Sequence, residues 1–74
     1  MEGTKKTAKK KQIVKITYIN GVNIRENPEI QSSILDVALY GEEFEISSIK
    51  NGYGRIVKGW INLDFTTYVK KSAD

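Results

Sequence analysis

The feature that most constrains this chain is the stretch 51–61, which carries two signals for a tight chain reversal. Asn51-Gly52 favours a two-residue hairpin turn, because both residue types tolerate a positive φ. Lys58-Gly59 offers a second reversal shortly afterwards. Two reversals this close together leave room for short antiparallel strands but not for a helix. The stretch therefore predicts three short strands and places the single tryptophan, Trp60, beside the second turn.

The rest of the chain repeats this pattern of short strands separated by turns. Apolar and polar residues alternate around Val22 and Ile24, which predicts that both face the core. Asn27-Pro28 ends that run, because proline cannot continue a strand ladder. Such spacing is typical of an all-β fold, a small barrel of five to seven short antiparallel strands. The expected elements are strands at 13–18, 22–25, 34–40, 42–49 and 65–69, with a single helical turn at 62–64.

Composition narrows the kinds of site that the chain can hold. Seventy-four residues make one domain with a small core. Cysteine and histidine are absent, which removes the commonest general base and zinc ligands, so we expect neither an enzyme nor a metal or cofactor site. Glu42, Glu43 and Glu45 are expected to form a solvated strand face. We also expect no membrane span or signal peptide, because no apolar run is long enough.

The net charge of +3 comes from the beginning of the chain. Residues 1–12 carry five lysines and one glutamate, whereas residues 13–74 carry seven basic and eight acidic side chains. Because residues 1–12 have almost nothing apolar to bury, we expect a flexible linker whose removal leaves thermal stability nearly unchanged. The alternative is a basic arm for nucleic acid, although no aromatic residue stands among the lysines. The barrel is expected at 13–71.

Several segments, taken in order, resemble the bacterial SH3 (SH3b) domain family. Val22–Arg25 followed by Pro28 is similar to the family's first block, Leu-Asn-Val-Arg-x-x-Pro. Asn51–Tyr53 stands where the family has Asn-Gly-Trp, with tyrosine in place of tryptophan. Residues 59–65 read Gly-Trp-Ile-Asn-Leu-Asp-Phe, which resembles the closing Gly-Trp-Ile-x-Leu-x-Tyr. The short hairpin at 56–59 is most similar to versions in clostridial lysins and phage endolysins.

The resemblance implies that the small barrel is SH3-like. It also implies a non-catalytic module that binds peptidoglycan, or its stem and cross-bridge peptides. Such a module targets a peptidoglycan hydrolase or endolysin, joined upstream, to the bacterial cell wall. Aromatic faces stack on sugars or peptide planes, and an arginine can pair with a stem-peptide carboxylate. The expected ligand-binding residues are Asn23, Arg25, Asn51, Tyr53 and Trp60.

Most of these residues also have a purely structural interpretation. Trp60 is either a ligand platform or a largely buried wedge that closes the barrel. Tyr53 either projects from the hairpin tip or covers one end of the barrel. Arg25 either pairs with a ligand or braces the loop that follows it by donating to backbone carbonyls. Tyr18 and Tyr68 are expected to be packing residues with solvated hydroxyls.

Two other classes of binding function stay open. One is a small-barrel nucleic-acid-binding protein that uses the basic residues of 1–12 for phosphate contacts. The other is an SH3-type adaptor for proline-rich peptides, since Ala38–Tyr40 is similar to the Ala-Leu-Tyr of eukaryotic SH3 domains but lies mid-barrel. We expect a monomer, with self-association through exposed edge strands as the alternative.

Overall fold

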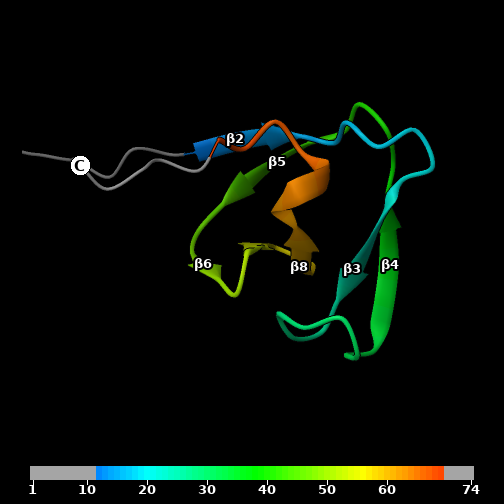
Figure 1. The fold of residues 1–74 in the computed structure, drawn as a ribbon, viewed down its shortest axis with the longest axis vertical. Coiled ribbons are helices and arrows are strands. Elements are labelled where there is room, and N and C mark those ends of the chain that lie inside the picture. Colours follow the sequence, from blue (N-terminus) through cyan, green and yellow to red (C-terminus); the bar gives the residue numbers. More distant parts are fainter. Residues whose placement is uncertain (1–11, 70–74) are drawn as a thin grey trace, which may run out of the picture.

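A computed structural model describes residues 12–69 as an all-β, barrel-like fold of two antiparallel sheets (Figure 1). Five strands form one sheet in the order β4-β3-β8-β7-β6, and β2 pairs with β5 in the other. The expected linker lies outside the described residues, except for Gln12, which begins β2. The elements are β2 (Gln12–Lys15), β3 (Val22–Arg25), β4 (Ile34–Ala38), β5 (Glu43–Ile46), β6 (Ile49–Lys50), β7 (Tyr53–Ile56), β8 (Gly59–Asn62) and a 3-10 turn, η2 (Leu63–Phe65).

The core lies between the two sheets and is almost entirely aliphatic. Val22 and Ile24 face inward from β3, as their alternation with polar neighbours predicts. Ile61 faces inward from the central strand β8 and is fully buried. Phe44 and Tyr68 are partly buried and pack against this cluster. The cluster consists of Val14, Ile16, Val22, Ile24, Ala38, Ile46, Ile56, Ile61 and Leu63.

Both predicted chain reversals are present. Asn51 has φ 53° and Gly52 has φ 79°, the positive values that a tight hairpin turn requires. Lys50 and Tyr53 therefore face each other across β6 and β7. The second reversal joins β7 to β8 and sets Ile56 opposite Gly59. The three short antiparallel strands expected at this part of the chain are confirmed.

The strand expected at 42–49 is interrupted where the chain passes from one sheet to the other. The backbone N–H of Ser47 donates to the carbonyl of Arg55, and the N–H of Arg55 donates to the carbonyl of Ser48, both over 2.9 Å. Two residues thus oppose one, which is the arrangement of a β-bulge and bends the strand. The bend lets β5 pair with β2 while β6, directly after it, pairs with β7.

The expected closing strand at 65–69 is wrong. The predicted helical turn is present as η2, with the Asn62 side chain accepting from the N–H of Asp64. After η2 the chain runs beside β2, but only Thr66 forms a bridge, with Ile16. The N–H of Lys15 donates to the side-chain hydroxyl of Thr67 instead of to a carbonyl, which interrupts the ladder. Side-chain competition of this kind is not visible in an alternation pattern.

Gly59 generates a stability prediction, because it lets β8 approach β3 closely. A Cβ at this position would lie 2.5 Å from the carbonyl oxygen of Arg25 and 3.0 Å from a methyl group of Ile24. The carbonyl belongs to the backbone of a paired strand and cannot move aside cheaply. We expect Gly59→Ala to lower the free energy of unfolding in denaturant titrations by about 2 kcal/mol through overpacking.

Gly41→Ala is the matched control for this prediction. Gly41 has φ 86°, and no atom lies within 4 Å of an added Cβ. Its replacement should cost only the strain of a positive φ, roughly 1 kcal/mol. A loss at Gly59 no larger than the loss at Gly41 would contradict the close approach.

Candidate functional site

The outer face of the five-stranded sheet carries a row of one tryptophan between two arginines. Arg25 on β3 lies opposite Trp60 on β8, and Trp60 in turn lies opposite Arg55 on β7. The neighbours of these residues in sequence, Ile24 and Ile61, are fully buried on the inner face. Side chains alternate along a strand, so the three members of the row share the outer face. We call this set the Arg-Trp-Arg row.

Arg55 and Trp60 make direct contact within the row. The guanidinium carbon of Arg55 lies 5.7 Å from the centre of the Trp60 ring, within the range of a cation–π interaction. Arg55 is exposed and Trp60 is partly exposed. The ring therefore holds the guanidinium in place while leaving it open to solvent. Sequence reasoning missed Arg55, although counting outward from the Ile56–Gly59 hairpin pairs it with Trp60.

Arg25, at the other end of the row, braces the loop that follows it. One guanidinium nitrogen, Nη1, donates to the carbonyl of Ser32 over 3.0 Å. Two further hydrogen bonds close the same loop, from the N–H of Glu26 to the carbonyl of Ser33 and from the N–H of Asn27 to the hydroxyl of Ser32. The bracing interpretation of Arg25 is confirmed. A guanidinium has five N–H donors, so this bond leaves others for a ligand.

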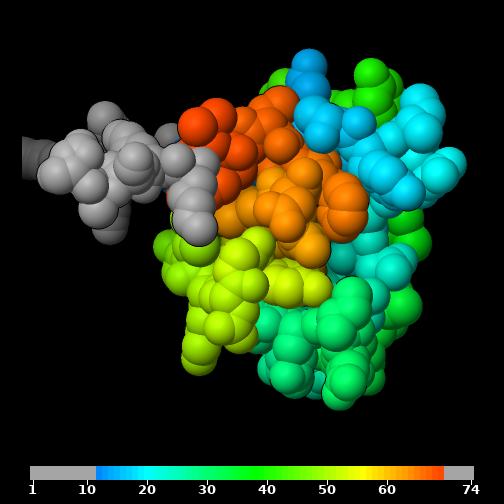
Figure 2. All heavy atoms as spheres, viewed as in Figure 1, coloured from blue at the N-terminus to red at the C-terminus, as the bar shows by residue number. Residues whose placement is uncertain are grey.

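Asn51 ties the same loop to the first hairpin. Its side-chain nitrogen Nδ2 donates to the carbonyl of Pro28 over 3.2 Å. The 26–33 loop, coloured teal to green, accordingly lies against the yellow hairpin residues in the space-filling view (Figure 2). Asn51 thus has two structural tasks, since it also supplies the positive φ of the turn.

Tyr53 is enclosed, which corrects the expectation that it projects freely from the hairpin tip. It is 7% exposed, yet it does not belong to the core cluster between the sheets. Its register partner is Asn62, and its alternation with Gly54 places it on the same outer face as the Arg-Trp-Arg row. The Asn51–Pro28 bond holds the loop against the hairpin that carries Tyr53. A contact between two loops is not encoded in strand alternation.

The structure brings most of the predicted residues together. Four of them lie at or beside the 26–33 loop, namely Arg25, Asn51, Tyr53 and Trp60. Asn23 is exposed on the same outer face but lies farther along β3, opposite Val37 of the edge strand β4. The predicted set is therefore one surface with Asn23 at its margin.

The surroundings of three further aromatic residues can be compared with what the sequence predicts for them. Trp60 lies on the outer face of the sheet, is partly exposed and does not belong to the core cluster. Tyr68 is partly buried against the core, as expected of a packing residue. Tyr18 is 44% exposed and packs on Phe65, with ring centroids 4.9 Å apart.

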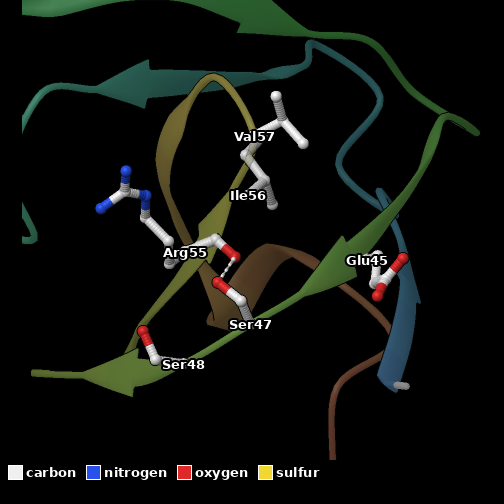
Figure 3. A pocket seen from close by; sticks show the side chains of 6 residues that line it. All are labelled: Glu45, Ser47, Ser48, Arg55, Ile56 and Val57. Atoms are coloured by element: carbon white, nitrogen blue, oxygen red, sulfur yellow. Dashed lines mark hydrogen bonds between the residues drawn. The ribbon is translucent and has the colours of Figure 1, made fainter.

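An open pocket of about 380 Å³ adjoins Arg55 (Figure 3). The hydroxyl of Ser47 donates to the backbone carbonyl of Arg55 over 3.4 Å, and Ser48 lies beside it. The guanidinium of Arg55 and the carboxylate of Glu45 lie on opposite sides of Ser47 in this view. The pocket thus offers hydroxyl groups and an apolar wall from Ile56.

Comparisons with protein-family models, with curated proteins and with solved structures found no match for this chain. Within residues 12–69, no three acidic side chains gather into a group that could hold a metal ion. No helix in that part of the chain is long and apolar enough to cross a membrane. The candidate site is therefore identified by the geometry of the Arg-Trp-Arg row and of the 26–33 loop beside it.

The bond from Arg25 to Ser32 leads to a second prediction. Arg25→Ala removes a charged donor from the loop, which should lower the free energy of unfolding by about 1.5 kcal/mol. It should also speed hydrogen exchange at the amide of Glu26, whose bond to Ser33 closes the loop. Amide exchange by NMR and a melting curve measure both effects. Arg55→Ala is the control, because Arg55 makes its side-chain contact with Trp60 and not with the loop. Unchanged exchange at Glu26 in Arg25→Ala would show that the loop holds without Arg25.

Proposed function

We propose that this chain is an SH3b-like module that binds bacterial peptidoglycan and so targets a peptidoglycan hydrolase, such as a phage endolysin, to the cell wall. The observation that carries the proposal is the Arg-Trp-Arg row on the outer sheet face. The resemblance of Val22–Arg25 and of residues 59–65 to the SH3b family supports it. In this proposal the module acts at the cell wall and performs no reaction of its own.

Each part of the site has a task in recognising a wall fragment. The partly exposed ring of Trp60 offers a flat apolar surface for a sugar ring or a peptide plane. The exposed guanidinium of Arg55 pairs with a carboxylate of the stem peptide. Arg55 thus takes the role that the sequence suggested for Arg25, because Arg25 already donates to Ser32 and positions the loop at the end of the row.

Nucleic-acid binding is the second candidate, and one observation favours it. An aromatic ring between two arginines can also stack on a base while the guanidiniums contact phosphates. Residues 13–74, however, carry eight acidic and seven basic side chains, so the fold as a whole does not attract a polyanion. A wall fragment, which presents a carboxylate near a sugar or peptide plane, suits the row better.

Binding to purified cell walls tests this proposal. The full chain should sediment with Gram-positive peptidoglycan, and Trp60→Ala and Arg55→Ala should each weaken binding about tenfold or more, as loss of a central contact does. Melting curves should show that both variants stay folded, because both side chains lie on the outer face. Lys50→Ala is the matched control, since it removes an exposed cation from the neighbouring strand β6.

Two outcomes would count against the proposal. The full chain staying in solution with walls from several clostridial or related species would refute wall binding. Retention on DNA-cellulose with no retention on walls, reduced by the same Trp60 and Arg55 substitutions, would assign the row to nucleic acid instead.

A further inference from the structure

The pocket beside Arg55 occupies the space where β5 and β7 separate. At the β-bulge the two strands are still joined, because the N–H of Ser47 donates to the carbonyl of Arg55. Beyond this bond β5 pairs with β2, and β7 turns into β8. Figure 3 shows the green strand β5 running away from the β7–β8 hairpin, with Glu45 on one wall and Val57 on the other. The pocket is thus a gap between two strands that the bond of Ser47 closes at one end.

The main chain of Glu45 faces this gap. Main-chain groups of residues two apart in a strand point to the same side. Since the N–H of Ser47 points away from β2 toward β7, the N–H and carbonyl of Glu45 do so as well. The alternate residues point toward β2, because the carbonyl of Glu42 accepts from the N–H of Ile16, directly after β2. Within residues 12–69, β5 pairs with β2 and with no second strand. Glu45 therefore presents one donor and one acceptor to the pocket, which is the pattern that an extended peptide backbone matches.

The charged side chains of the pocket are separated by sign. In Figure 3 the guanidinium of Arg55 and the hydroxyl of Ser48 lie on one side of Ser47, and the carboxylate of Glu45 lies on the other. The ring of Trp60, 5.7 Å from the guanidinium carbon, holds the cation in place. A guanidinium and a hydroxyl together suit a carboxylate. The negative charge of Glu45 disfavours a ligand with further negative charges along its length, such as a phosphate polymer.

The pocket has room for the end of a peptide chain. Its volume of about 380 Å³ lies near the lower limit of the roughly 300–1,000 Å³ that ligand sites occupy. Ile56 and Val57 line it with apolar groups, and Val57 is 98% exposed, so a small side chain can lie against it. A few residues with small side chains fit such a space better than a long or bulky segment.

We propose that this pocket binds the carboxyl-terminal end of an extended peptide. The main chain of the ligand exchanges hydrogen bonds with the N–H and carbonyl of Glu45, and its terminal carboxylate pairs with Arg55 and accepts from the hydroxyl of Ser48. Under the proposed function, on which this inference rests, the ligand is a stem peptide whose carboxyl terminus is free. A stem peptide whose terminus is consumed in a cross-link lacks the carboxylate and binds poorly.

The test compares one peptide with and without its terminal charge. N-acetyl-D-alanyl-D-alanine is a suitable ligand, because it combines peptide groups, small side chains and a free carboxyl terminus. In an NMR titration of the full chain, the free acid should bind about tenfold more tightly than the C-terminal amide, as expected for loss of a charge-assisted contact. Hydrogen exchange at the amide of Glu45 should slow as the acid saturates the pocket.

Three variants assign the contacts. Arg55→Gln should bring the acid and the amide to equal affinity, and the fold should persist because the side chain lies on the outer face. Glu45→Pro removes the N–H that faces the pocket but no bond to β2, so it should weaken the binding of both peptides about tenfold. Glu43→Pro is the matched control, since its N–H has the same orientation but the residue does not line the pocket, and it should bind like the unaltered chain. If Glu45→Pro unfolds, exchange at the Glu45 amide of the unaltered chain tests the same bond.

Three results would overturn the inference. They are equal binding of acid and amide by the unaltered chain, unchanged exchange at the Glu45 amide at saturation, and an equal loss of binding in the two proline variants. Sedimentation with cell walls tests the proposed function separately. A chain that sediments with walls but does not discriminate acid from amide binds the wall through another surface. A chain that prefers the acid but does not sediment retains the peptide pocket and loses the role at the cell wall.

Discussion

The structure depends first on the pairing of β8 with a strand on each side. β8 lies between β3 and β7, buries Ile61 on the inner face and presents Trp60 on the outer face. Gly59 allows β8 to lie this close to β3, because any side chain at residue 59 would collide with the backbone of β3. The same pairing that closes the core therefore builds the Arg-Trp-Arg row. The core and the candidate site use opposite faces of β8, so any shift of this strand would disturb both.

The loop beside the row is held by polar contacts and not by burial of apolar groups. Ser32 is bonded by Arg25 from the sheet, and Pro28 is bonded by Asn51 from the hairpin turn. Hydrogen bonds of this kind each contribute roughly 1 kcal/mol, so the loop is held firmly only by their combination. Arg25 and Asn51 were expected to touch a ligand. In the structure they position the loop, while Arg55 in the same row is exposed and makes no contact with the loop.

Much of this fold was predictable because turn chemistry and alternation are local. Asn51-Gly52 specified its hairpin, and the alternation in Val22–Arg25 placed Val22 and Ile24 in the core. The errors arose where distant segments meet. Tyr53 is buried next to a hairpin turn that bonds Pro28, far away in sequence, and the Thr67 hydroxyl interrupts a ladder with Lys15. The position of Arg55 is predictable in the same way, since the register of the Ile56–Gly59 hairpin pairs it with Trp60.

The exposed edge of β4 follows from the size of the fold. Within residues 12–69 the larger sheet has five strands and the smaller sheet has two, β2 and β5, so the smaller sheet cannot bury every strand of the larger one. β4 is the strand that stays exposed, because Ala38 is its one buried residue and the other four are in contact with solvent. A small domain with a wide sheet must leave such an edge, and apolar side chains on it favour pairing. Two backbone N–H groups at or next to this edge are satisfied by side chains instead of by a further strand. Asp36 directly precedes Val37 and Glu42 follows Leu39 by three positions, so each acceptor lies close to its donor in the sequence.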